Sequence, residues 1–196
     1  MTVSGLDFAG PAPASVDGSV ATLPIGRPAP VFDNLLGTDG RRHSLADYAD
    51  REIVVLIFSS NRCPTAKAYG GRLNALQAEY APRGVQLLAV NSNDPHLYPE
   101  EGYRRMVERA AADGYTFPYL FDDGQQAARA YGPTRTFHVF VLDGQRLLRY
   151  EGRFDDSRIV ERVTTPDLAN ALDDLLAGRA VRVARTKPFG CSLDLA

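Results

Sequence analysis

The chain has 196 residues, 44% of them hydrophobic, and a formal net charge of −2. This length and composition fit one globular domain with extensions, and the charge provides no general attraction to nucleic acid or anionic membrane. The longest apolar run, residues 53–58, has the length of a strand and is too short for a membrane span. The first residues lack the basic region and apolar block of a secretory signal. We therefore expect a cytoplasmic protein without nucleic-acid or membrane partners.

The first half of the chain reads as a β-α-β unit behind a leader. Residues 1–24 are rich in Pro, Ala, Gly and Ser and are predicted to form a flexible leader, and residues 25–50 to form short strands and turns. Residues 53–58 are predicted to be a buried strand, residues 64–80 a helix, and residues 85–90 a second buried strand. This order implies a parallel strand pair with a right-handed crossover.

The second half adds alternating helices and strands and then a tail. The predicted elements are a helix from Pro99, a strand over 117–121, a helix over 125–131, a hairpin of strands 138–142 and 146–150, and a helix after Thr165-Pro166 that Gly178 ends. We place one domain over 25–179 and a tail over 180–196 that carries Cys191. The predicted class is α/β, with a central mixed sheet flanked by helices and an N-terminal β extension.

Two cysteines, Cys63 and Cys191, are the candidate chemical groups. A secreted disulfide scaffold would have more cysteines. Two cysteines and three histidines without CxxC or HxxxH spacing predict no metal site, and no other cofactor is expected. Cys63 follows a buried strand and opens the helix over 64–80. The N-terminus of a helix presents unpaired N–H groups and a partial positive charge, which stabilise a thiolate.

The residues around Cys63 favour a reactive thiol. Pro64 suits the first helical turn, because its missing N–H has no partner to lose there. The side chains of Arg62 and Lys67 can lower the pKa of the thiol. The alternative is an inert, buried cysteine after a core strand. We favour the reactive interpretation because Asn61 and Arg62 make this turn polar.

Several short segments resemble a known superfamily in their order and spacing. They are residues 25–32, 58–64 (Phe-Ser-Ser-Asn-Arg-Cys-Pro), 91–95 (Asn-Ser-Asn-Asp-Pro), 117–121 (Phe-Pro-Tyr-Leu-Phe) and 186–191 (Thr-Lys-Pro-Phe-Gly-Cys). Together they resemble the thioredoxin-like redoxin superfamily, which holds the peroxiredoxins and their thiol-disulfide oxidoreductase relatives. The match is to a bacterial peroxiredoxin-like branch of thiol-specific antioxidant type, with a Cys-Pro active-site turn and a C-terminal Gly-Cys. The resemblance covers about residues 25 to 195.

The resemblance implies a thioredoxin-like fold and a thiol-dependent oxidoreductase acting in antioxidant defence or redox homeostasis. Cys63 would be the nucleophile. Either Cys191 would resolve a sulfenic acid formed on it, or an external thiol would do so and Cys191 would be a free thiol on the tail or one packed at a dimer contact. Ser60 and nearby backbone N–H groups would orient the reacting atoms, and Asn61 would either hydrogen-bond around the thiol or be an ordinary turn residue. The expected partners are a small peroxide or disulfide substrate and an external thiol reductant, and analogy with such folds leaves a homodimer open.

The chain departs from the superfamily pattern at two places. Ser60 keeps the hydroxyl of the peroxiredoxin threonine, or replaces the first cysteine of a CxxC motif, while Leu56 stands where peroxiredoxins carry proline. Phe137 stands where thioredoxin-like proteins carry a cis-proline, and we expect its peptide bond to be trans because a non-proline cis bond is costly. This departure weakens the expectation of protein-disulfide exchange more than that of peroxide reduction. Arg135 is the candidate for the arginine that holds the peroxide in peroxiredoxins.

Two other classes of function stay open at this point. In the first, the protein is a redox sensor or binding module in which Cys63 is oxidised without turnover. In the second, it is a degenerate thioredoxin-fold scaffold, for which Ser60 and Phe137 are the supporting residues. Sustained turnover with a reducing thiol would separate the enzyme from the sensor, and an unreactive Cys63 would favour the scaffold.

Overall fold

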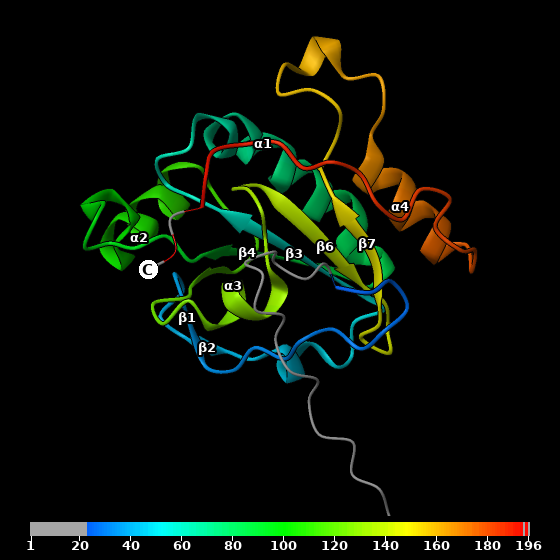
Figure 1. The fold of residues 1–196 in the computed structure, drawn as a ribbon, viewed down its shortest axis with the longest axis horizontal. Coiled ribbons are helices and arrows are strands. Elements are labelled where there is room, and N and C mark those ends of the chain that lie inside the picture. Colours follow the sequence, from blue (N-terminus) through cyan, green and yellow to red (C-terminus); the bar gives the residue numbers. More distant parts are fainter. Residues whose placement is uncertain (1–22, 194, 196) are drawn as a thin grey trace, which may run out of the picture.

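The computed structural model describes residues 23–193 and 195, so the predicted leader lies outside the described residues except for its last two positions. A seven-stranded sheet in the order β2-β1-β5-β4-β3-β6-β7 forms the centre (Figure 1). Its strands are β1 (Leu35–Gly37), β2 (Arg42–His43), β3 (Ile53–Ser59), β4 (Val85–Asn91), β5 (Tyr119–Phe121), β6 (His138–Leu142) and β7 (Leu148–Gly152). Strands β3, β4 and β5 are parallel, and the outer strands pair antiparallel. The sheet confirms the expected mixed α/β class.

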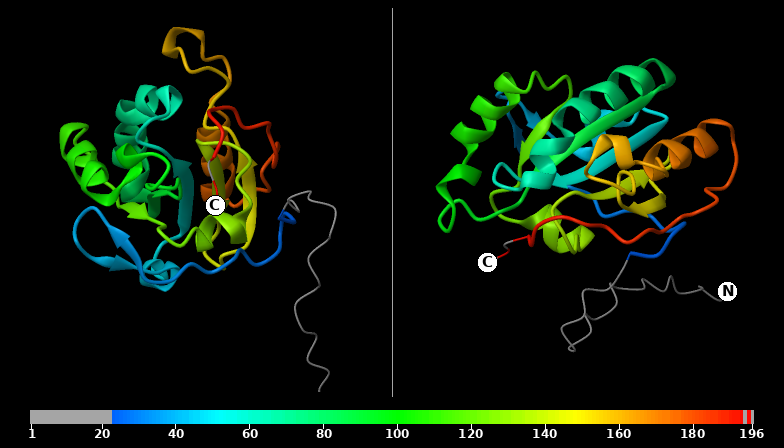
Figure 2. Two further views of the ribbon diagram at one scale, coloured as in Figure 1. Left: turned by 60° about the vertical axis from the view of Figure 1, so that its left-hand side comes forward. Right: turned by 90° about the horizontal axis from the view of Figure 1, so that it is seen from above.

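Helices cover both faces of the sheet. They are α1 (Pro64–Tyr80), α2 (Tyr103–Ala112), α3 (Gln126–Tyr131) and α4 (Asp167–Leu176), with short 3-10 turns at Leu45–Tyr48, Ala81–Arg83, Pro99–Glu101 and Val160–Arg162. Helices α1, α2 and α4 pack on one face, and α3 packs with the N-terminal segment on the other (Figures 1 and 2). No helix in residues 23–193 is long and apolar enough to cross a bilayer.

Strand β3 lies at the middle of the sheet and is buried at every position. Its side chains alternate between the two faces, so that Val55 and Ile57 join one apolar cluster while Leu56 and Phe58 join the other. A strand covered on both faces reads as a continuous hydrophobic run, which is why this element was predictable. The end of β3 therefore enters α1 from a rigid position.

Three predicted elements have different bounds in the structure. The helix expected from Pro99 is a 3-10 turn that ends at Glu101, and α2 starts only at Tyr103 because Gly102 is extended, with φ −67° and ψ 153°. The second strand of the hairpin starts at Leu148, two residues later than predicted. Arg146 takes a left-handed conformation, with φ 60°, and lengthens the turn. The strand predicted over 117–121 is shorter and begins at Tyr119.

The C-terminal segment runs back along β7 toward the start of α1 (Figure 2, right). The N–H of Glu151 donates to the Ala184 carbonyl at 3.0 Å, and the N–H of Thr186 donates to the Glu151 carbonyl at 3.1 Å. These bonds satisfy backbone groups at the open edge of the sheet. Gly152 permits this approach, because its φ is 148° and a Cβ there would lie 2.1 Å from Thr186 Oγ1.

We predict that Gly152→Ala lowers the free energy of unfolding by about 1–3 kcal/mol, because the new methyl group overlaps the backbone of Thr186. The matched control is Gly71→Ala, at a helical position with open space around it, which should stabilise the protein by about 0.5–1 kcal/mol. Urea unfolding measures both changes. A Gly152→Ala variant as stable as the parent protein would contradict the close packing of the C-terminal segment on β7.

Candidate active site

Cys63 lies between the end of β3 and the first turn of α1. It is the N-terminal cap residue of α1, and Pro64 follows at the first helical position, as the sequence predicted. The Cys63 side chain is 2% exposed and belongs to the apolar cluster under α1. Its sulfur lies 2.7 Å from the sulfur of Cys191, which the C-terminal segment brings back across 128 residues of sequence. Both cysteines are free.

The surroundings of Cys63 lower its pKa below the ordinary value of 9.0. Burial raises the pKa, but hydrogen bonds to the thiolate outweigh it. They come from the Cys191 thiol and from the backbone N–H groups of Ala66, Cys191 and Thr65. Two of these N–H groups belong to the first turn of α1, where no helical partner exists for them. The first turn of α1 thus supplies two of the hydrogen bonds that lower the pKa, and the Cys191 thiol supplies the strongest one.

The pKa of Cys191 moves in the opposite direction, to about 11. Burial is the largest cause, followed by the hydrogen bond with Cys63 and the negative charge of its thiolate, while the positive charge of Arg62 acts against the rise. The two thiols therefore ionise in a fixed order. The Cys63 thiol is the more acidic of the two, and Cys191 keeps its proton when Cys63 is ionised.

A buried carboxylate holds the turn that leads to Cys63. The Glu101 side chain is 1% exposed. Its Oε1 accepts a hydrogen bond from Ser60 Oγ at 2.5 Å, and its Oε2 accepts one from the Asn61 N–H at 2.7 Å. Ser60 Oγ in turn accepts from the N–H groups of Arg62 at 3.1 Å and Cys63 at 3.0 Å. Ser60 thus fixes the backbone on which the thiol is mounted.

Asparagine side chains complete this network. Asn61 donates to the Glu100 carbonyl at 2.8 Å and accepts from the Tyr119 hydroxyl at 3.0 Å. Asn91, at the end of β4, donates to Glu101 Oε2 at 2.9 Å. Asn93 donates to the carbonyl of Ser59 at 3.2 Å. The segment Asn91-Ser-Asn-Asp-Pro95 therefore belongs to the support of the active-site turn.

A polar cavity of about 350 Å³ opens onto the two sulfurs. Its walls are Ser60, Arg62, Cys63, Pro64, Asn93, Tyr98, Glu101, Cys191 and Ser192. The guanidinium of Arg62 stacks on the Tyr98 ring, with its carbon 3.3 Å from the ring centre. The cavity thus opens onto Cys63 beside the positive charge of Arg62.

Two predicted cations do not take part in this geometry. Lys67 is exposed on the first turn of α1, and the groups that act most strongly on Cys63 are Cys191 and backbone N–H groups. Arg135 is exposed and does not line the cavity at Cys63, where Arg62 is the cation. A role for Lys67 or Arg135 in the reaction stays a prediction.

Phe137 is buried next to the site, and its peptide bond is trans, as expected. Its φ of 75° is unusual for a residue with a side chain. The Phe137 N–H donates to the Phe58 carbonyl, and its ring packs on Tyr69 with ring centres 4.3 Å apart. The preceding residue, Thr136, donates its N–H to the Cys191 carbonyl at 2.9 Å. Phe137 thus stands at the position where thioredoxin-like proteins carry a cis-proline, and the backbone of the preceding residue binds the C-terminal segment.

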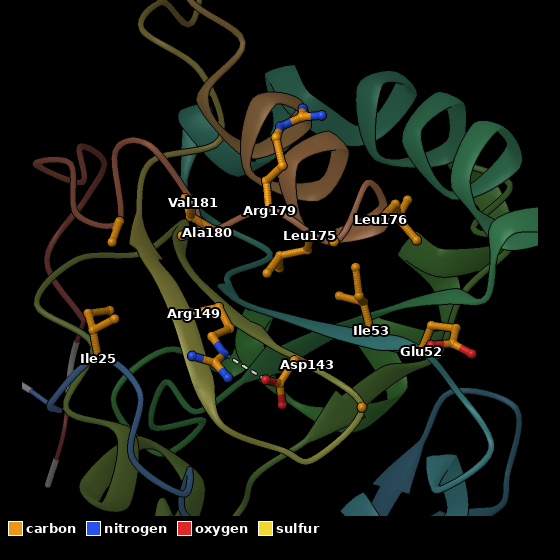
Figure 3. A pocket seen from close by; sticks show the side chains of 13 residues that line it. Ile25, Glu52, Ile53, Asp143, Arg149, Leu175, Leu176, Arg179, Ala180 and Val181 are labelled. Carbon is orange, nitrogen blue, oxygen red and sulfur yellow. Dashed lines mark hydrogen bonds and ion pairs between the residues drawn. The ribbon is translucent and has the colours of Figure 1, made fainter.

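A second, larger cavity of about 710 Å³ lies at the opposite end of β3 (Figure 3). Ile53, Leu175 and Leu176 provide apolar walls, and Arg149 and Asp143 form an ion pair of 2.6 Å across its side. Its lining contains neither cysteine. Among the described residues, no group of three or more His, Cys, Asp or Glu side chains could hold a metal ion.

Glu101 is the site residue that sequence reasoning missed. The prediction placed it in a helix starting at Pro99, where a glutamate is an ordinary exposed residue. Its contacts reach back about 40 positions to Ser60 and Asn61, and no local pattern reports such a contact. The only available signal was the resemblance carried by residues 91–95, which lie just before it.

The comparisons with known proteins agree with this geometry. The chain is 33% identical over 119 residues to the thiol-disulfide oxidoreductase ResA of Geobacillus thermodenitrificans, covering 61% of this chain and 63% of that protein. It thus spans less than two thirds of that relative's length. A crystal structure of a hypothetical protein from Sinorhizobium meliloti 1021 matches with a TM-score of 0.83 and 35% identity, over 90% of this chain and 97% of the other.

The fold and family follow from two further matches. A putative thiol:disulfide interchange protein DsbE from Chlorobium tepidum matches with a TM-score of 0.62 and 23% identity, over 80% of this chain and 98% of the other, and this likeness confirms the thioredoxin-like fold. The family model described as AhpC/TSA matches residues 25–151, which include Cys63 and the residues that hold its turn. This chain belongs to the AhpC/TSA family.

Proposed function

We propose that the protein is a thiol-dependent oxidoreductase that reduces a small oxidant with the pair Cys63 and Cys191. The observation that carries this proposal is the 2.7 Å separation of the two sulfurs in a polar cavity. The opposite pKa shifts of the two thiols give each a separate role. The name of the ResA relative supports thiol-disulfide chemistry, and the family supports the wider class.

With a hydroperoxide as oxidant, the Cys63 thiolate attacks the terminal oxygen. The O–O bond breaks, Cys63 becomes a sulfenic acid, and the leaving alkoxide takes a proton to give the alcohol. The sulfur of Cys191 then attacks the Cys63 sulfur, which forms the Cys63–Cys191 disulfide and releases water. Two thiols have lost two electrons in total, and the peroxide has gained them.

With a low-molecular-weight disulfide as oxidant, the same pair gives the same product. The Cys63 thiolate attacks one sulfur, forms a mixed disulfide and releases the other sulfur as a thiolate. Cys191 then displaces the second half. The hydroperoxide is favoured by the 2% exposure of Cys63 and the small polar cavity, since both select against a bulky substrate.

An external thiol returns the pair to its reduced state. It attacks Cys191, because this sulfur is the more exposed of the two and because Cys63, with the lower pKa, is the better leaving group. A second external thiol then releases Cys191. The cycle makes the protein an antioxidant enzyme whose reductant must reach only the outer cysteine.

We predict that one equivalent of hydrogen peroxide produces an intramolecular Cys63–Cys191 disulfide. Intact mass after alkylation should show a loss of two hydrogens, and peptide mapping should link the two cysteines. Cys191→Ser should stop at a sulfenic acid on Cys63, and Cys63→Ser should lose peroxide turnover with dithiothreitol. Turnover by Cys63→Ser at the parental rate would refute the proposal. Oxidation of Cys63 without turnover would favour a sensor, and an unreactive Cys63 would favour a scaffold.

We predict that alkylation of Cys63 by iodoacetamide has a pH midpoint below 9, because only the thiolate reacts and its pKa is lowered. The rate should rise with pH through this midpoint and level off above it. Cys191→Ala removes a hydrogen-bond donor and should raise the midpoint above that of Cys191→Ser, which keeps a hydroxyl, by about one unit. Equal midpoints for the two variants would exclude a contribution of the Cys191 hydrogen bond to the acidity of Cys63.

We predict that Glu101→Gln slows the oxidation of Cys63 by hydrogen peroxide by about tenfold, a barrier increase of about 1.4 kcal/mol. The two oxygens of Glu101 accept hydrogen bonds from the Ser60 hydroxyl and the Asn61 N–H. A glutamine has an NH2 group in place of one of these oxygens, so a donor would face a donor and the turn at Ser60 would shift. The pH midpoint of Cys63 alkylation should rise as well.

The matched control for Glu101→Gln is the exposed neighbour Glu100, of which only the backbone carbonyl contacts the site. Glu100→Gln should leave the oxidation rate and the pH midpoint unchanged within twofold. Circular dichroism at the assay temperature verifies that both variants are folded. A Glu101→Gln variant that is folded and has the parental midpoint would show that this carboxylate does not position Cys63.

A further inference from the structure

The last part of the C-terminal segment lies in the site as an extended peptide would. The Thr136 N–H donates to the Cys191 carbonyl at 2.9 Å, and the Thr136 hydroxyl donates to the Ser192 carbonyl at 3.3 Å. Phe189 and Cys191 pack against the apolar cluster that holds Cys63. Main-chain hydrogen bonds combined with side-chain packing are the means by which proteins bind extended peptides. The strand end at Thr136 therefore offers a peptide groove, and Phe189–Ser192 occupies it.

The groove has room only for glycine at the position before the cysteine. Gly190 has a φ of 153°, and a Cβ on it would lie 2.0 Å from the Thr136 carbonyl oxygen. That oxygen belongs to the rigid backbone beside β6, so it cannot move aside as a flexible side chain could. A peptide bound in the same way must carry glycine before its cysteine.

The C-terminal segment has a second point of attachment, which lies outside the groove at Thr186. Thr186 Oγ1 accepts a hydrogen bond from the Arg153 N–H at 3.0 Å and shares one with the Tyr150 hydroxyl at 2.7 Å. Because this anchor, at β7 and the residue after it, is fixed, residues 189–192 are held near the groove at a high effective concentration. An external peptide must compete with a segment that is tethered next to its binding site.

We propose that Phe189–Ser192 fills, within the same chain, a groove for extended Gly-Cys peptides, and thereby excludes polypeptide disulfides from Cys63 while small oxidants enter through the cavity. The proposal rests on the proposed function only in taking Cys63 as the reacting thiol. It assigns the substrate selectivity of the site to the C-terminal segment. When the segment is displaced, the groove accepts a peptide whose cysteine lies opposite Cys63.

The test uses full-length variants that carry Cys191→Ser, so that Cys63 is the only thiol. The probe is the peptide Lys-Pro-Phe-Gly-Cys-Ser, with its cysteine in a mixed disulfide with 2-nitro-5-thiobenzoate. The Cys63 thiolate attacks the peptide sulfur, a Cys63–peptide disulfide forms, and the coloured thiobenzoate leaves as a thiolate. The second probe is the same peptide with valine in place of glycine.

The double variant Gly190→Val with Cys191→Ser should have a displaced segment. It should react with the glycine peptide at least tenfold faster than the Cys191→Ser reference. In this variant the valine peptide should react at least tenfold more slowly than the glycine peptide. Phe189→Asp places a charge against the apolar cluster and should displace the segment by a different route, with the same gain. The matched control is Lys187→Ala, an exposed position next to the segment, which should change neither rate by more than twofold.

The outcomes separate this inference from the proposed function. If both displacing variants react with the glycine peptide no faster than the Cys191→Ser reference, the segment does not block the groove. If they react with the glycine and valine peptides at equal rates, the groove does not select for glycine before the cysteine. All rates are compared at a pH above the Cys63 alkylation midpoint of each variant, because displacing the segment also removes the Cys191 backbone N–H that helps to lower the pKa of Cys63. Under that condition hydrogen peroxide should oxidise Cys63 in all variants within threefold of the reference. Loss of that oxidation in the reference itself, with peptide selectivity retained, overturns the proposed function alone.

Discussion

The hydrogen bonds of Glu101 with the turn at Ser60 and Asn61 are the contacts on which the candidate site depends. A carboxylate that is almost fully buried must have its lone pairs satisfied. The Ser60 hydroxyl, the Asn91 amide and backbone N–H groups of the active-site turn satisfy them. The same contacts keep the start of α1 pointing at the sulfur of Cys63. The low pKa of the thiol thus comes first from the hydrogen bond with the Cys191 thiol and then from backbone N–H groups, two of which belong to the first turn of α1.

The C-terminal segment supplies the second thiol of the site. A buried thiol at the end of β3 has access to small oxidants but has no second thiol within its own turn, because Ser60 and Ala66 stand at the positions where a CxxC motif would carry one. Cys191 provides that thiol from a distant part of the chain. Its position is set by contacts of the backbone with Thr136 and of Gly152 with Thr186.

Local patterns were sufficient for much of the fold and for Cys63. The buried strand at 53–59 and the helix over 64–80 were predictable because one is a continuous apolar run and the other has helical spacing that starts at a proline. Glu101 was not predictable, since its contacts join segments far apart in the sequence. A pairing of the two cysteines was one of the roles expected for Cys191, but no local pattern determines that the two sulfurs lie close together. The conformation of Phe137 was predictable only as a trans bond, because its left-handed φ depends on packing against Tyr69.

The separation of Cys63 and Cys191 along the chain links the redox state of the protein to its resistance to unfolding. A disulfide between them would close a loop of 128 residues. Closing a loop of that size removes conformational entropy from the unfolded chain, which is worth on the order of 4–5 kcal/mol of stability. By thermodynamic reciprocity, a fold that holds the two sulfurs together favours their oxidation to the same extent. The melting temperature of the protein would then be higher when the external thiols that reduce it are oxidised and lower when they are reduced.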